Sequence, residues 1–105
     1  MAVVENKATR EFITSIAKDA HKIGQDNDIY ASVMIAQAIL ESSSGNSALA
    51  QAPNYNLFGM KGSYKGASVN FNTLEASSNN NIFSINASFR KYPNLKASLK
   101  DYADL

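Results

Sequence analysis

The stretch YASVMIAQAILESSSGNS, residues 30–47, decides the fold: an apolar run ends on one carboxylate, Glu41, followed by three serines and a glycine. The run is apolar on nearly every face of a helix, which is typical of a helix buried at the centre of a domain. We therefore predict a central helix over residues 30–42, with Asp28 as its N-cap and Gly45 at its end.

Glu41 lies where this helix stops, and two effects at that position favour the protonated form of its side chain. Partial burial disfavours a charge, and so does the negative end of the helix dipole. A carboxylic acid that keeps its proton near neutral pH is what general acid catalysis needs. The position fits an ordinary solvated glutamate equally well, so the residues alone leave both interpretations open.

A second helix is predicted before the central one, over residues 9–23. Thr9 suits its N-cap, Gly24 its stop, and the polar GQDND that follows suits a turn. Its apolar residues recur at helical spacing and form one stripe. They are Phe12, Ile13, Ile16, Ala20 and Ile23.

After Asn54 the pattern changes from helical to alternating. NYNLFGMKGSYKG, residues 54–66, predicts an ordered loop whose aromatic rings belong either to the core or to a cleft. ASVNFNTLE and NIFSINASFRKY then alternate around the polar ASSNNN, which predicts an antiparallel hairpin. Glu75 falls on the apolar face of the first strand and beside the turn, so it is either a functional carboxylate or a solvated turn residue.

The chain closes with an amphipathic helix, in which Leu95, Leu99 and Tyr102 share a face and Asp101 lies on the polar side. Its apolar stripe is unfinished at Leu105, so we expect a domain that lacks its last element.

Composition excludes several classes of protein. A net charge of +1 argues against nucleic-acid binding and against polybasic membrane binding. The absence of cysteine excludes disulfides, zinc fingers and thiol catalysis, and a single histidine, His21, excludes a two-histidine metal site within the chain. We expect one domain with no metal and no cofactor, acting on a neutral or mildly charged substrate.

Three motifs together resemble one family. SVMIAQAILESSSGNSALAQAPNYNLFGMKG closely resembles the signature of the bacterial glucosaminidases that cleave peptidoglycan, glycoside hydrolase family 73. NTLE before a polar turn and FRKYPN after it are similar to the hairpin of that family and the segment after it. The resemblance implies an α+β, lysozyme-like fold with a helical lobe and a small antiparallel hairpin lobe around a cleft. Residues 9–105 would form this domain, preceded by an extension over residues 1–8.

The resemblance also implies roles for single residues. Glu41 would be the catalytic acid, Glu75 the base or a stabilising carboxylate, and Tyr92 a cleft aromatic that supports catalysis. The signature and its flank supply the candidate substrate-binding residues. They are Asn56, Phe58, Gly59, Lys61 and Tyr64.

The hypothesis that follows is hydrolysis of the β-1,4 bond after N-acetylglucosamine in bacterial peptidoglycan, outside the cell or in its wall. Separate wall-anchoring domains would be partners within a longer protein. Two alternatives stay open: a muramidase or lytic transglycosylase that cuts the other β-1,4 bond, and a peptidoglycan-binding module without turnover.

Overall fold

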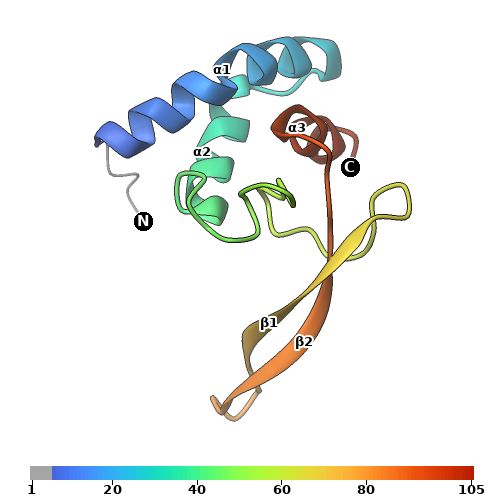
Figure 1. Ribbon diagram of the computed structural model, residues 1–105. Coiled ribbons are helices and arrows are strands. Elements are labelled where there is room, and N and C mark those ends of the chain that lie inside the picture. The colour runs from blue at the N-terminus through green and yellow to red at the C-terminus, as the bar shows by residue number, and fades with distance from the viewer. Residues whose placement is uncertain (1–5) are drawn as a thin grey trace.

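The computed structural model describes residues 6–105, with Glu75 described by its backbone alone. Three helices form one lobe, and a twisted two-stranded antiparallel hairpin projects from it (Figure 1). In chain order the elements are α1 (Lys7–Asn27), α2 (Ala31–Ser42), β1 (Ser68–Ala76), β2 (Ile82–Arg90) and α3 (Leu95–Ala103). The predicted α+β architecture is confirmed. Residues 1–5 of the expected extension lie outside the described residues, and Lys7 already belongs to α1.

Helix α1 is longer than predicted at both ends. Asn6, not Thr9, is its N-cap, and the Asn6 Oδ1 atom accepts a hydrogen bond from the Thr9 N–H at 2.8 Å. Gly24 does not stop the helix: a Cβ there would lie 2.6 Å from the Ile29 carbonyl oxygen, so glycine is needed for a close approach. Asp28, at φ 55°, caps the end of α1 and not the start of α2, because its N–H donates to the Gly24 carbonyl.

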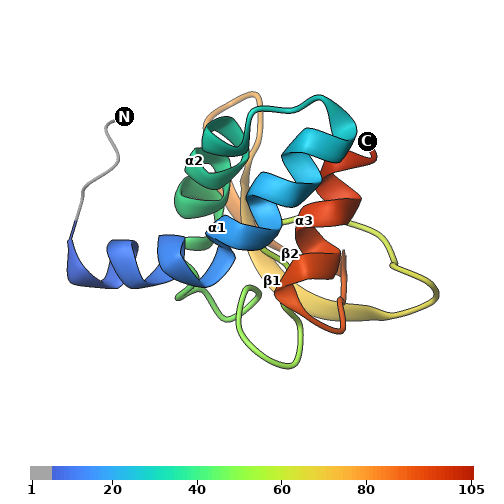
Figure 2. The ribbon, with the colours of Figure 1, turned by 90° about the horizontal axis from the view of Figure 1, so that it is seen from above.

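The core forms between the helices. The predicted stripe of α1 is buried or packed against buried residues, and α1 contacts both α2 and α3, which lie beneath it in Figure 1 and beside it in Figure 2. Each large apolar side chain that is fully buried in this core contributes about 1.5–3 kcal/mol. The residues at the centre are Phe12, Ile16, Ala20, Met34, Ala38, Leu57 and Leu99.

Helix α2 has the predicted bounds to within one residue but is not buried all round. Met34, Ala38 and Ser42 form a buried stripe, whereas Val33 is 53% exposed and Leu40 is 44% exposed. The expectation of a helix buried on nearly every face is therefore wrong for the described part of the chain, where neighbours cover one side of α2.

The turn after α2 is unusual, because three successive residues adopt left-handed backbone conformations: Ser43, Ser44 and Gly45, at φ 53°, 56° and 80°. The buried Ser42 hydroxyl donates to the Ala38 carbonyl and accepts from the Gly45 N–H at 2.8 Å. The Ser44 hydroxyl lies 2.9 Å from that of Thr9 on α1. These bonds offset the strain of the turn and fix the end of α2.

The hairpin confirms the predicted pairing. Its register runs from Ser68 opposite Arg90 to Ala76 opposite Ile82. Val69 therefore faces Phe89 across the strands. The rings of Phe71 and Phe89 pack edge to face, with 6.4 Å between their centroids.

Gly45 offers a test of the turn after α2, because a Cβ there would lie 2.6 Å from the Phe12 ring. Gly66 has nearly the same φ, +83° against +80°, but a Cβ added to it would meet nothing within 4 Å. We expect Gly66→Ala to lower the free energy of unfolding by about 1 kcal/mol, from conformation alone. Gly45→Ala should cost at least about 1–3 kcal/mol more, because the ring must move. Urea denaturation measures both, and equal losses would contradict the proposed contact.

Candidate active site

Glu41 occupies the last turn of α2, one residue before the buried Ser42. Its side chain is exposed, so the partial burial expected for it is wrong in the free protein. What the structure supplies is a fixed backbone: Ser42 and Gly45 hold the helix end from the inside, and Thr9 holds the turn from α1. The backbone that carries Glu41 is thus fixed, and its carboxyl group is open to a ligand.

Glu75 lies in β1, where its Cα is paired with that of Phe83 near the tip of the hairpin. Its side chain lies outside the described residues, so its role as second carboxylate stays a prediction. The pairing places its backbone on the projecting lobe, whereas Glu41 belongs to the helical lobe.

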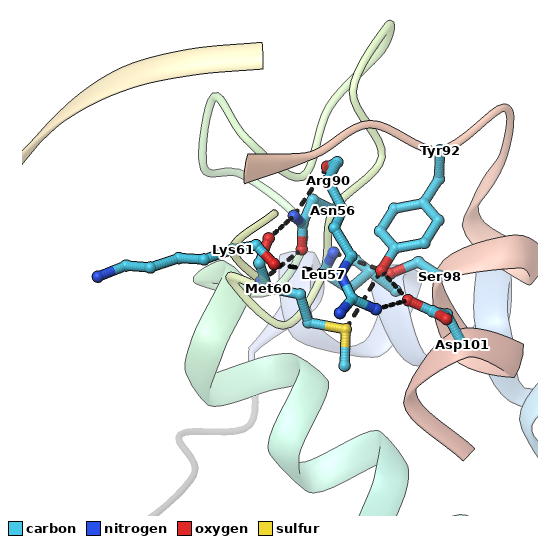
Figure 3. Close-up of polar contacts among 8 residues, drawn as sticks. All are labelled: Asn56, Leu57, Met60, Lys61, Arg90, Tyr92, Ser98 and Asp101. Carbon is cyan, nitrogen blue, oxygen red and sulfur yellow. Dashed lines mark hydrogen bonds and ion pairs between the residues drawn. The ribbon is translucent and has the colours of Figure 1, made fainter. Parts of the chain in front are cut away.

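Asn56 joins these two lobes. Its side chain is 1% exposed, and its amide makes three hydrogen bonds (Figure 3). The Nδ2 atom donates to the carbonyls of Met60 and Arg90, both at 2.9 Å, and the Oδ1 atom accepts from the Met60 N–H at 3.0 Å. A predicted substrate-binding residue is therefore fully engaged in tying the signature loop to the end of β2.

Tyr92 belongs to a second polar cluster, beside the first in Figure 3. The Tyr92 hydroxyl donates to Asp101 Oδ2 at 2.6 Å, and Arg90 Nη1 lies 2.6 Å from the same oxygen. Burial and the neighbouring Asp101 carboxylate raise the pKa of Tyr92 well above its ordinary value. With Tyr92 1% exposed, this contact locks the end of β2 onto α3. Asp101 does not lie simply on a polar face, as expected, because it is partly buried and bonded twice.

The other predicted substrate-binding residues lie along the same loop. The Phe58 ring stacks on the ring of Tyr102 in α3, with 4.2 Å between the ring centroids. The Tyr64 ring packs against that of Tyr92, with 4.7 Å between the centroids. Gly59, between Phe58 and Tyr64 in sequence, has a positive φ of 65°. The carbonyl oxygen of Lys61 accepts from Arg90 Nε at 3.1 Å. As substrate contacts, these residues remain predictions; the structure assigns Phe58 and Asn56 to packing and to loop geometry.

Two residues that sequence reasoning missed carry buried hydroxyls. Ser42 holds the turn after Glu41, and Ser98 Oγ accepts from the Leu57 N–H at 3.1 Å. A signal for Ser98 was present: it falls in the Leu95–Leu99–Tyr102 stripe of α3, where a polar residue needs a partner. Among the side chains that the structure describes, which exclude that of Glu75, no cluster of three or more His, Asp or Glu is placed to hold a metal ion.

The surface is hollowed in two places worth naming. A hollow of about 470 Å³ lies at the start of α2, between His21 and Tyr30, and α2 puts it about 18 Å from the Glu41 end. His21 itself is exposed. A second hollow, of about 370 Å³, lies between the loop and the segment after β2. Neither is lined by Glu41.

Three helices with a projecting antiparallel hairpin are the arrangement of glycoside hydrolase domains of the lysozyme-like α+β class. The chain belongs to the glucosaminidase family: residues 17–105 match the model of that family, described as mannosyl-glycoprotein endo-beta-N-acetylglucosaminidase. The match favours the glucosaminidase hypothesis over the muramidase, transglycosylase and binding-module alternatives.

The chain is also similar to known proteins over nearly its whole length. A Staphylococcus aureus protein named as containing an N-acetylmuramoyl-L-alanine amidase domain is 72% identical over 103 residues, which are 98% of this chain and 16% of that protein. An autolysin of Enterococcus faecalis is 49% identical over 102 residues, or 97% of this chain and 14% of the autolysin. The crystal structure of the catalytic domain of the Listeria monocytogenes autolysin Auto superposes with a TM-score of 0.90 at 48% identity, covering 98% of this chain and 58% of that chain. This chain therefore spans a small part of the length of these two sequence relatives.

The hydrogen bonds of the Asn56 amide should contribute measurably to the free energy of unfolding, because they connect the two lobes. Asn56→Ala leaves the Met60 N–H and two carbonyls without their buried partner, so we expect the free energy of unfolding to fall by about 3 kcal/mol. Asn70→Ala, at an exposed position of β1, is the control and should stay within about 0.5 kcal/mol of the wild type. Urea denaturation of both variants measures this difference. If Asn56→Ala lowered the free energy of unfolding as little as the control does, the proposed role of Asn56 in joining the lobes would be contradicted.

Tyr92 predicts a pH dependence in the alkaline range. Its folded-state pKa is raised, so its stabilising effect is complete below the ordinary value of 10.0 and is lost as pH rises above it, when the unfolded chain ionises first. Tyr92→Phe removes the bond to Asp101 and should cost about 2 kcal/mol at pH 7. The difference in free energy of unfolding between wild type and variant should therefore narrow above pH 10. This difference isolates Tyr92, because the other four tyrosines are common to both proteins. Urea denaturation from pH 7 to 11 tests this, and a constant gap would refute it.

Proposed function

We propose that this chain hydrolyses the β-1,4 glycosidic bond after N-acetylglucosamine in bacterial peptidoglycan, with Glu41 as the general acid. The observation that carries the proposal is a carboxylic acid at the end of α2, in a family match that runs from residue 17 to residue 105. The buried Ser42 and the left-handed turn after it fix the backbone of that acid.

The exposure of Glu41 is compatible with this role. Catalytic groups in free enzymes are often poorly aligned and tighten only when substrate binds. A bound sugar chain would cover the carboxyl group and exclude water, which favours the protonated acid. We propose that desolvation arrives with the substrate and is not built into the free protein.

The chemistry then needs one proton and one water molecule. Glu41 donates its proton to the glycosidic oxygen, and the bond from that oxygen to the anomeric carbon breaks with its electron pair left on the oxygen. An oxocarbenium-like centre develops on the sugar ring. In the inverting route Glu75 takes a proton from a water that attacks the opposite face, which requires carboxyl groups roughly 6.5–9.5 Å apart. In the alternative route the substrate's own N-acetyl group attacks and Glu75 orients it.

The remaining predicted residues receive supporting roles in this proposal. We assign Asn56 and Tyr92 to positioning, because their polar atoms already bond to loop, strand and α3. Gly59, Lys61 and Tyr64 remain the proposed contacts to the glycan. The site of action would be the bacterial cell wall, as the names of the autolysin relatives suggest. No helix within residues 6–105 is long and apolar enough to cross a membrane.

Glu41→Gln tests the proposal directly, since glutamine keeps the shape of the side chain and removes the acid. We expect hydrolysis of purified peptidoglycan to fall at least about 100-fold, the usual contribution of a general acid. Glu11→Gln, an exposed glutamate on α1, is the matched control and should keep full activity.

Mass spectrometry of the fragments identifies the bond that is cut. Reducing-end N-acetylglucosamine is the expected product. Reducing-end N-acetylmuramic acid or a 1,6-anhydro product would replace the glucosaminidase assignment, and an unchanged rate in Glu41→Gln would remove Glu41 from the reaction.

A further inference from the structure

The second hollow, of about 370 Å³, is lined by two lysines among apolar and aromatic groups. The lysines are Lys65 and Lys91, and the apolar walls include Pro53, Tyr64 and Pro93. Among the described residues no carboxylate lines the hollow. Glu41 is not part of it either, so the hollow is distinct from the proposed catalytic acid.

The hollow has firm walls. Tyr64 and Ala67 exchange two backbone hydrogen bonds, at 2.9 and 2.8 Å, around a two-residue turn of Lys65 and Gly66. Both turn residues have positive φ, 48° and 83°, the combination that such turns normally fill with asparagine and glycine. A lysine therefore stands where the backbone favours another residue, and the strain of that choice needs a reason.

Lys65 and Lys91 both line this hollow, and neither has an acidic partner among the described residues. Lys65 Nζ lies 5.4 Å from the centroid of the Tyr64 ring, and the Lys91 N–H donates to the Ala67 carbonyl at 3.3 Å, which brings its segment against the turn. Within the described part of the chain, neither side-chain ammonium makes an ion pair.

We propose that this hollow binds a carboxylate-bearing peptide of the cell wall, of the kind attached to the glycan strands. The two ammonium groups would hold the carboxylate by charge-assisted hydrogen bonds, and the proline and tyrosine walls would pack against small apolar side chains. These apolar walls favour a peptide over a polyol-phosphate polymer, the other anion of many bacterial walls. The inference rests on the proposed function for its substrate and extends it, because Tyr64, a proposed contact to the glycan, also lines the hollow.

The test compares two double variants that lose the same charge. Lys65→Gln/Lys91→Gln removes both ammonium groups from the hollow, and Lys18→Gln/Lys96→Gln removes two exposed lysines from α1 and α3. Each is assayed on intact peptidoglycan, on glycan stripped of its peptides by an amidase, and on peptidoglycan stripped of phosphate polymers by hydrofluoric acid. Circular dichroism and urea denaturation confirm that both variants fold.

We expect the hollow variant to raise KM on intact peptidoglycan roughly 10-fold with kcat unchanged. The defect should persist after phosphate removal and disappear on peptide-free glycan, and the control should match the wild type throughout. A defect that vanishes with the phosphate polymers would overturn the peptide assignment, and so would a defect that persists on bare glycan or no defect at all.

Sedimentation with insoluble wall, in the Glu41→Gln background, measures binding without turnover. If the Lys65→Gln/Lys91→Gln variant binds less to peptide-bearing wall, and binds normally to peptide-free glycan, the result supports the hollow as a peptide site. That result would stand even if the wild type released no fragments, so failure of the proposed function is distinguishable from failure of this inference. Equal binding by both double variants would refute the hollow as a peptide site.

Discussion

The buried amide of Asn56 is the interaction on which the arrangement of the two lobes depends. A hairpin of two strands has little stability of its own in water, and this one projects away from the helices. Asn56 compensates by satisfying three backbone groups at once, two within the signature loop and one at the end of β2. Because an unpaired buried backbone group costs about 1–3 kcal/mol, the loop and the strand end cannot separate cheaply.

The contacts of Arg90 and Tyr92 with Asp101 on α3 complete the connection between the two lobes. They also account for polar side chains at the end of β2 and just after it. Arg90 and Tyr92 both reach Asp101 Oδ2, so one carboxylate on α3 holds two positions on either side of Lys91. The base of the hairpin is thereby fixed at two points, Asn56 and Asp101, while its tip lies away from the helices. A hairpin anchored at its base can change its distance from Glu41 by bending, which suits the proposal that Glu41 acquires its catalytic environment only when a glycan binds.

The elements could be predicted well from the sequence because their signals are local. Helical spacing indicated α1, α2 and α3, and alternation indicated the antiparallel hairpin. The errors arise from tertiary contacts that no local pattern encodes. Gly24 reads as a helix stop, yet it is a point of close approach to Ile29. Asn56 reads as a polar loop residue available to a ligand, yet its partners lie as far away as Arg90. The burial of Glu41 was misjudged for the same reason, because apolar letters in α2 do not reveal which sides have neighbours.

Charge gives the clearest case of a global property hiding a local one. A net charge of +1 argues against a long-range basic field, because such a field needs many unpaired cations. It has no bearing on two lysines that share one hollow, since at contact distance the interaction depends on the local geometry and dielectric environment, not on the sum over the chain. Under the two proposals, the substrate is neutral along its glycan, where Glu41 would act, and anionic along its peptides, which the hollow lined by Lys65 and Lys91 would bind. A polymer with a neutral glycan and anionic peptides could then bind both near Glu41 and in the hollow. The net charge of the chain does not indicate either of these interactions.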